Sequence, residues 1–306
     1  MSATLLLAQL LNGLQYGVLL FLLAAGLTLV FGIMSFVNLA HGSLYMLGAY
    51  AAAVAYAATG SFTLAIGAAM ATALALGLLL EVTIVSRLYR RDHLDHVLAT
   101  FGLVMFFNEL VRIVWGPQPL FVQVPEVLSG TVEILGFSYP SYRFAIIVAG
   151  LVVALGSHLL IHKTRVGMLI RAGAQNPQLV SALGVNIGLL NAMLFGVGAM
   201  LAGVAGAMAG PVLSVQSGMG EPVLITTLVV IVIGGIGSVS GALYAALIVG
   251  VVDTLGRVFL PLLLRQVAER SLADAAGPAL ASMSVYLLMA LVLALRPQGL
   301  FPARRG

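Results

Sequence analysis

The 306-residue chain is 61% hydrophobic and only 8% charged, with 14 basic and 10 acidic residues. A typical soluble domain carries roughly 25% charged residues, so this composition argues against a soluble enzyme, a disordered protein and a nucleic-acid binder. A few cytoplasmic arginines in a membrane protein would account for the net charge of +4. Because the chain contains no cysteine, disulfides, thiolate metal sites and a cysteine nucleophile are excluded. The remaining class is an integral membrane protein with several spans.

The first 80 residues contain no Asp, Glu, Lys or Arg, and the first charged residue is Glu81. A cleaved signal peptide begins with a positively charged region, so we expect this stretch to be retained as membrane helices. About 20 apolar residues cross the hydrocarbon core. The stretch therefore accommodates three spans, at about 6–32, 36–58 and 62–86.

Further apolar segments follow the charged cluster that begins at Arg87. Full spans are predicted at about 97–115, 142–162, 188–213, 240–262 and 279–296. The apolar run 223–237 is too short for a full crossing, so we expect it to be re-entrant or half of a broken helix. The fold prediction is an all-α polytopic bundle of about 8–9 transmembrane spans with discontinuous helices. Residues 1–306 are expected to form a single membrane domain, since no polar stretch reaches the ~50 residues of a separate domain.

Basic residues set the orientation of the predicted bundle. The segments 87–95 and 163–187 and the C-terminal tail hold most of them, so we place all three in the cytoplasm. The segment 116–141 contains no Lys or Arg and is expected to be a periplasmic loop. The N-terminus then lies outside. The loop 263–278 also falls outside despite its two arginines, against the general rule.

Catalytic, metal and cofactor sites are not expected. His158 and His162 have the spacing of metal ligands on a helix, but no third ligand is evident. The cluster Asp92–His96 lies in a loop that water solvates. The glycine-rich run Gly234–Ser238 lacks the lysine of a phosphate-binding loop, so the chain is not expected to hydrolyse ATP by itself.

Ion coupling usually requires a buried acid within the membrane. Each candidate acid here has a basic neighbour within reach on its own helix. The expected pairs are Glu109–Arg112, Asp253–Arg257 and Glu81–Arg87. An ion-coupled secondary transporter or channel therefore stays open as an alternative function, as does a structural or respiratory membrane subunit.

A polar notch, Asn38–Ser43, interrupts the uncharged N-terminal stretch. Irregular backbone at membrane depth persists only where it is buried in protein or lines a cavity, so we predict a helix break beside the transport path. Asn38 and Ser43 are expected to cap freed backbone groups there. The alternative is a plain interfacial turn. The candidate path residues are Gln15, Asn38, His41, Gly42, Ser43 and Gln216.

Small residues recur through the span at 188–213, including the pattern Gly206–Gly210. Such faces let helix backbones approach closely in lipid, where no hydrophobic force drives helices together. We therefore expect a tightly packed bundle.

The segment Thr164–Asn186 is the strongest local signal in the sequence. Asn176 is a good N-cap, Pro177 suits the first helical turn, and Gly184 suits the C-terminal stop. A helix of about two turns is marginal alone, so we expect its apolar side to dock in a groove of another protein. That side is formed by Leu179, Val180 and Leu183.

Four stretches together carry a resemblance to a known family. They are Ala25–Gly42, Thr164–Asn186, Gly234–Gly241 and Arg296–Phe301. With these stretches the chain resembles the permease subunits of bacterial ABC importers for branched-chain amino acids, the LivH type.

The resemblance implies a multi-pass protein of the inner membrane that works with a second permease subunit, two cytoplasmic ATP-binding subunits and a periplasmic binding protein. It also implies that Thr164–Asn186 is the coupling segment that contacts the ATP-binding subunits, and that the 116–141 loop meets the binding protein. The family also contains importers of urea and short amides, so these solutes are the alternative cargo. The residues expected to take part in coupling are Arg171, Asn176, Pro177, Leu179, Val180, Leu183 and Gly184.

Overall fold

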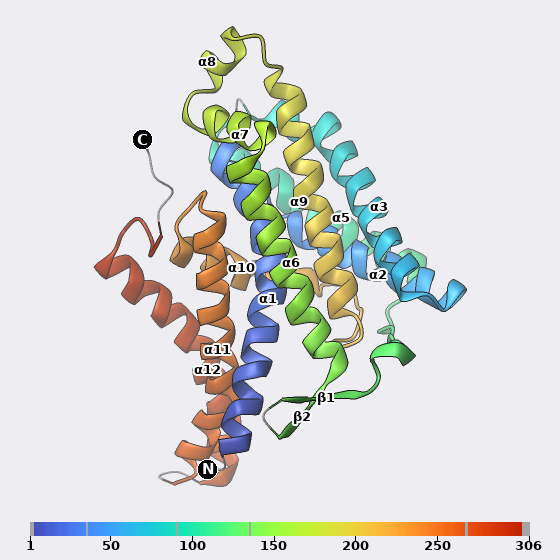
Figure 1. The fold of residues 1–306 in the computed structure, drawn as a ribbon, viewed down its shortest axis with the longest axis vertical. Coiled ribbons are helices and arrows are strands. Elements are labelled where there is room, and N and C mark those ends of the chain that lie inside the picture. Colours follow the sequence, from blue (N-terminus) through green and yellow to red (C-terminus); the bar gives the residue numbers. More distant parts are fainter. Residues whose placement is uncertain (1–2, 35, 90, 135, 267–268, 302–306) are drawn as a thin grey trace.

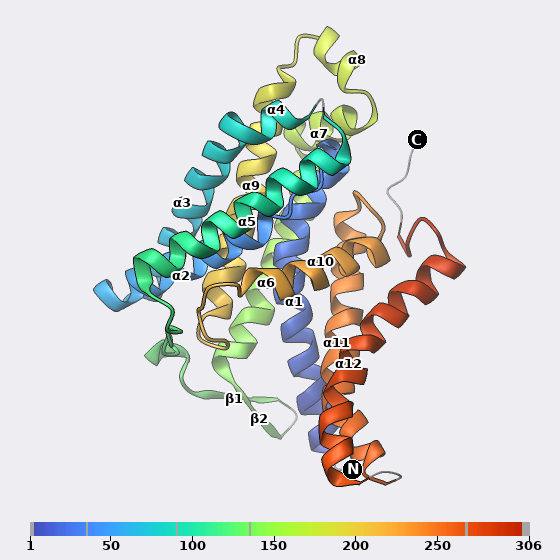
Figure 2. The ribbon, with the colours of Figure 1, turned by 180° about the vertical axis from the view of Figure 1, so that it is seen from behind.

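The computed structural model describes residues 3–34, 36–89, 91–134, 136–266 and 269–301. Within these residues seven helices are long and apolar enough to cross a membrane, which confirms the all-α polytopic fold. They are α1 (Ala3–Met34), α3 (Phe62–Leu80, continued by the π-helix η1, Glu81–Val85, and by α4, Ser86–Leu88), α5 (His93–Trp115), α6 (Ser141–Lys163), α9 (Ile187–Ala209), α11 (Val239–Leu264) and α12 (Arg270–Leu295). Figures 1 and 2 show them as one elongated bundle.

Two further helices, α2 (His41–Thr59) and α10 (Gly220–Gly234), account for the difference between seven helices and the predicted eight to nine spans. The 15 residues of α10 extend about 22 Å, less than the ~30 Å of a hydrocarbon core. Figure 2 shows α10 lying across the bundle instead of along it. The short run expected at 223–237 is therefore a half-length helix.

The chain doubles back between α1 and α2. The imidazole Nε2 of His41 lies 3.3 Å from the carbonyl oxygen of Leu23, which is about 16 Å along α1 from its end at Met34. The non-helical residues 36–40 thus return into the depth of the bundle before α2 begins. This geometry confirms a discontinuous membrane segment at the predicted break.

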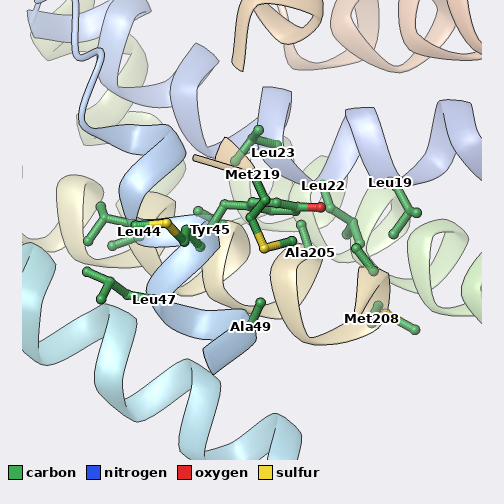
Figure 3. Packing of buried hydrophobic residues seen from close by; sticks show 14 of the residues in the cluster. Leu19, Leu22, Leu23, Leu44, Tyr45, Leu47, Ala49, Ala205, Met208 and Met219 are labelled. Carbon is green, nitrogen blue, oxygen red and sulfur yellow. The ribbon is translucent and has the colours of Figure 1, made fainter. Parts of the chain in front are cut away.

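Glycines bring the central helices into backbone contact. A Cβ at Gly48 of α2 would lie 2.4 Å from the Cα of Gly203 in α9, and a Cβ at Gly26 of α1 would lie 2.6 Å from the Gly198 carbonyl oxygen. Aliphatic side chains and Tyr45 fill the space beside these contacts, as Figure 3 shows. The tight packing expected from the small-residue pattern is confirmed.

The two ends of the bundle differ. One end holds the N-terminus, the short helix η2 (Glu126–Leu128) and a hairpin of β1 (Thr131–Ile134) and β2 (Phe137–Pro140), which was not predicted from the sequence. The opposite end holds α7 (Arg165–Gln175) and α8 (Pro177–Ala182) (Figure 1).

Hydrogen bonds to Asn12 of α1 tie both the hairpin and the start of α6 to the bundle. The hydroxyl of Tyr139 and the guanidinium of Arg143 donate to its side-chain oxygen, at 3.3 and 2.7 Å. Burial raises the pKa of Tyr139 although Arg143 lowers it, so the hydroxyl keeps the proton that it donates. The loop before the hairpin is held by a backbone pair between Leu120 and Val215.

We expect Gly206→Ala to destabilise the fold, because the added Cβ would lie 2.0 Å from the carbonyl oxygen of Tyr45. Overpacking of this kind costs about 1–3 kcal/mol. Gly67→Ala in α3 is the matched control, since a Cβ there meets nothing within 4 Å. Thermal unfolding in detergent should show a lower midpoint for Gly206→Ala alone. Equal midpoints for the two variants would contradict the packing argument.

Candidate functional site

The starts of α2 and α10 meet inside the bundle. A Cβ at Gly220 would lie 2.2 Å from the carbonyl oxygen of Gly42, and a Cβ at Gly42 would lie 2.8 Å from that of Gly220. Only residues without a side chain allow this approach. We call this contact the α2–α10 junction and define it by Gly42, Ser43, Gly220 and Glu221.

Glu221 brings a carboxylate to the junction in the first turn of α10. Its Oε1 accepts a hydrogen bond from the side-chain amide of Asn108 in α5, and the backbone carbonyl oxygen of Asn108 accepts one from the Ser217 hydroxyl at 3.0 Å. Its Oε2 is buried and has no hydrogen-bond partner. A buried charged oxygen without a partner is costly. This carboxylate is therefore the least compensated group at the junction.

The space beside Glu221 is narrow. It lies between α2, α5 and α10 and leaves no room for a water molecule. A cleft of about 1400 Å³ lies toward the α7–α8 end, lined mainly by α1, α6, α7, the last turn of α10 and the start of α11, with Thr28, His158 and Arg171 among its polar residues. The helix α10 thus begins at the closed junction and ends beside the open cleft.

The residues Asn38–Ser43 lie at the predicted helix break, but their hydrogen bonds differ from the predicted ones. Asn38 is 1% exposed, and neither atom of its amide has a hydrogen-bond partner. The residue that precedes α2 is Ala40, and no side chain caps the helix. The capping expected of Asn38 and Ser43 is therefore wrong, because the backbone amides of Ser43 and Leu44 bond to the Ala40 carbonyl instead.

The remaining path residues lie apart from one another. Gln15 is buried on α1, about 12 Å along the helix from Leu23, and Gln216 is exposed in the loop before α10. The structure brings Gly42 and Ser43 together with Glu221, and the role of all six path residues stays a prediction. Sequence reasoning missed Asn108 and Glu221. The acidic residue followed by Pro222 is a helix-start signal that marks α10, but its partner in α5 leaves no local trace.

The segment expected to couple to other subunits forms two capped helices. The Oγ1 of Thr164 accepts a hydrogen bond from the Gly167 amide at 3.0 Å at the start of α7, a helix that was not predicted from the sequence. The Oδ1 of Asn176 accepts one from the Leu179 amide at 2.9 Å at the start of α8. Gly184 ends the segment with φ +88°. The predicted start and stop of this short helix are confirmed.

The apolar side of α8 is divided. Leu179 and Leu183 are 58% and 76% exposed, whereas Val180 is 5% exposed and packs within the chain. The expectation that all three share a docking surface is therefore wrong for Val180. Arg171 donates to the carbonyl of Ile161 in the last turn of α6, so its guanidinium is engaged within the chain. The exposed apolar surface of α8 consists of the two leucines, which we call the leucine pair.

Two of the predicted ion pairs are confirmed. Arg112 lies 2.9 Å from Glu109, and Arg257 lies 2.7 Å from Asp253. The pairing expected between Glu81 and Arg87 is replaced by a hydrogen bond of 2.6 Å from the hydroxyl of Tyr89.

The rings of His158 and His162 stack with centroids 4.4 Å apart. No group of three His, Asp or Glu residues that suits a metal occurs in the described part of the chain.

We expect Asn108→Leu to destabilise the protein by about 1–3 kcal/mol, because it leaves the Glu221 carboxylate without its donor. The double variant Asn108→Leu with Glu221→Leu removes both polar partners and should be more stable than the single variant. Thermal unfolding of the purified chain in detergent measures both. A double variant that is less stable than Asn108→Leu alone would contradict the assignment of this pair.

Comparisons with known proteins place this architecture in a family. Residues 9–295 match the family described as the permease component of branched-chain amino acid transport systems. The chain is 28% identical to the permease protein BraD of Pseudomonas aeruginosa over 96% of this chain and 95% of that protein, and 28% identical to LivH of Escherichia coli K12 over 83% and 87%.

A probable LivH of Methanocaldococcus jannaschii is 26% identical over 78% of each chain. No solved structure shows a significant match. The seven membrane-type helices, the two half-length or broken segments and the match over nearly the whole length lead to one conclusion. The chain belongs to the family of permease components of branched-chain amino acid transport systems.

Proposed function

We propose that the chain is the permease subunit of an ABC importer that carries branched-chain amino acids across the bacterial inner membrane. Separate cytoplasmic ATP-binding subunits supply the energy. The observation that carries the proposal is the exposed leucine pair on α8. In Figure 1, α8 lies beyond α7 at one end of the bundle. The chain as a whole belongs to the permease family. The named cargo of the relatives supports the choice of substrate.

The distribution of charge supports an orientation with α7 and α8 in the cytoplasm. Exposed basic residues at that end include Arg87, Lys163 and Arg165. At the hairpin end, Arg112 is paired with Glu109, and Arg265 lies 2.7 Å from Asp274. Positive charge in short loops favours the cytoplasmic side. The 116–141 loop then faces the periplasm, where a substrate-binding protein docks on it.

In the proposed cycle the ATP-binding subunits contact the leucine pair and move α8 and α7. The central helices are in backbone contact, so they move as packed units instead of deforming gradually. The junction at Gly42 and Gly220 is closed in this structure, and its opening would lead the cargo along α10 to the cleft beside α7. A second permease subunit completes the path.

We expect Leu179→Asp with Leu183→Asp to abolish co-purification of the ATP-binding subunits, because two charges would enter an apolar contact. The control is Gln178→Asp with Ala182→Asp, which adds the same charge to exposed positions of the same helix. Affinity purification from detergent extracts measures the amount of ATP-binding subunit retained. Retention of these subunits and of uptake in the leucine-pair variant would contradict the docking assignment.

We expect the complete complex in liposomes to accumulate labelled leucine when ATP and a loaded binding protein are supplied. The chain alone should accumulate none, since the energy enters through other subunits. Parallel assays with urea and a short amide determine the cargo. Uphill uptake by the lone chain under an ion gradient would show a secondary transporter instead.

A further inference from the structure

Glu81 is a buried acid that the proposed transport path does not use. It is 2% exposed and begins the π-helix η1, in which the Ser86 amide donates to the Glu81 carbonyl five residues earlier. Single π-turns inside α-helices are rare and often mark functional positions. A carboxylate within a membrane span is costly and is usually functional. The residues that contact Glu81 are therefore candidates for a role in the movement of the bundle.

Tyr89 connects Glu81 to the end of α1. Its hydroxyl donates to the Oε2 of Glu81 at 2.6 Å and also lies 3.4 Å from the sulfur of Met34, the last residue of α1. Its ring meets that of Phe36 edge-on, with centroids 6.0 Å apart. Burial and the carboxylate raise the pKa of Tyr89, so the hydroxyl keeps its proton. One side chain thus contacts the chain on both sides of the point where α1 ends.

Met34 connects the same cluster to the predicted coupling segment. It packs against a buried group formed by Ile170 of α7 with Leu190 and Leu194 of α9. It also packs against the central core, as Tyr89 does. A continuous series of contacts therefore leads from α7 through Met34 to Tyr89.

The series continues into the broken segment. Phe36 is fully buried between Tyr89 and the ring of His96, whose centroid lies 4.6 Å away. His96 is fixed by a contact of 2.9 Å between its Nε2 and the carbonyl oxygen of Leu88. Phe36 begins the residues that lead to Asn38 and to α2, and the start of α2 forms the junction with α10.

We propose that Tyr89 and Glu81 are positioning residues for transport: their hydrogen bond fixes the Tyr89 side chain, which contacts Met34 and Phe36, so that movement of α7 reaches the α2–α10 junction. Glu81 is buried and Tyr89 is half-buried, and a hydrogen bond in such surroundings is electrostatically stronger than one in water. Without it the ring of Tyr89 is free to move away from Glu81, and a displacement of Met34 no longer moves Phe36. This inference rests on the proposed function, since it assigns a step of that transport cycle.

The test uses the complete complex in liposomes, with leucine uptake and ATP hydrolysis measured in the same sample. Tyr89→Phe keeps the ring contacts and removes the hydroxyl. We expect the ATP-binding subunits to stay bound and uptake per ATP hydrolysed to fall by about fivefold or more, the lower range of coupling between sites. Glu81→Gln keeps an acceptor oxygen and should give an intermediate ratio. The double variant should be no worse than Tyr89→Phe, since both changes act on the same hydrogen bond.

The control is Tyr142→Phe in α6. It also removes a buried tyrosine hydrogen bond, the 2.8 Å bond to the carbonyl of Met208, but it lies in the first turn of α6, directly after the hairpin. We expect its uptake per ATP to equal that of the unaltered complex. An equal fall in both variants, or a Tyr89→Phe ratio within about twofold of the unaltered complex, would overturn the proposal, because a coupling effect exceeds that range.

Two further outcomes separate this inference from the proposed function. If Tyr89→Phe fails to assemble, Glu81→Gln must still lower the ratio, and an unchanged ratio there overturns the positioning role. If the unaltered complex hydrolyses ATP but moves no leucine, the proposed cargo is wrong. The ratio is then measured with the solute that the complex does accumulate.

Discussion

Backbone polar groups at membrane depth must find partners inside the protein, because lipid offers none. The ends of the discontinuous helices meet this requirement in specific ways. At the end of α10 the carbonyl oxygens of Ile233 and Gly234 accept hydrogen bonds from the amides of Leu300 and Phe301, at 2.8 and 3.1 Å. The C-terminal residues of the described chain are therefore part of the membrane structure, and they allow α10 to end where it does.

The same requirement explains why the breaks are rich in glycine. At the α2–α10 junction two backbones touch, and at the other end of α10 a Cβ on Gly299 would lie 2.6 Å from the backbone of Gly235. Gly235 itself has φ +100°, a conformation that residues with a Cβ rarely adopt. Glycine thus permits both the turn and the close approach that satisfies the freed backbone groups.

Hydropathy and charge were sufficient to predict the long helices and the broken segment at Asn38–Ser43, since these depend on local burial. The caps of α8 were also predictable, because Asn176 and Gly184 act on their immediate neighbours. The contact between Asn108 and Glu221 joins residues that are 113 positions apart and was not predictable from local patterns. Val180 was misassigned for a related reason: helical spacing shows which residues share a side, but not which neighbour covers it.

Three of the acids on the apolar helices, Glu81, Glu221 and Asp253, are compensated in different ways. The ion pair with Arg257 compensates the negative charge of Asp253 and stabilises Asp253 in its position. Glu81 and Glu221 are held by neutral donors, a hydroxyl and an amide. A buried carboxylate without a countercharge keeps much of its desolvation cost.

Glu81 reaches the start of the broken segment through Tyr89, whose ring contacts Phe36, and Glu221 lies beside Gly42 and Ser43 at its other end. A rearrangement of residues 36–43 would therefore change the surroundings of both of these acids, while the ion pair of Asp253 with Arg257 lies in α11 and can stay intact.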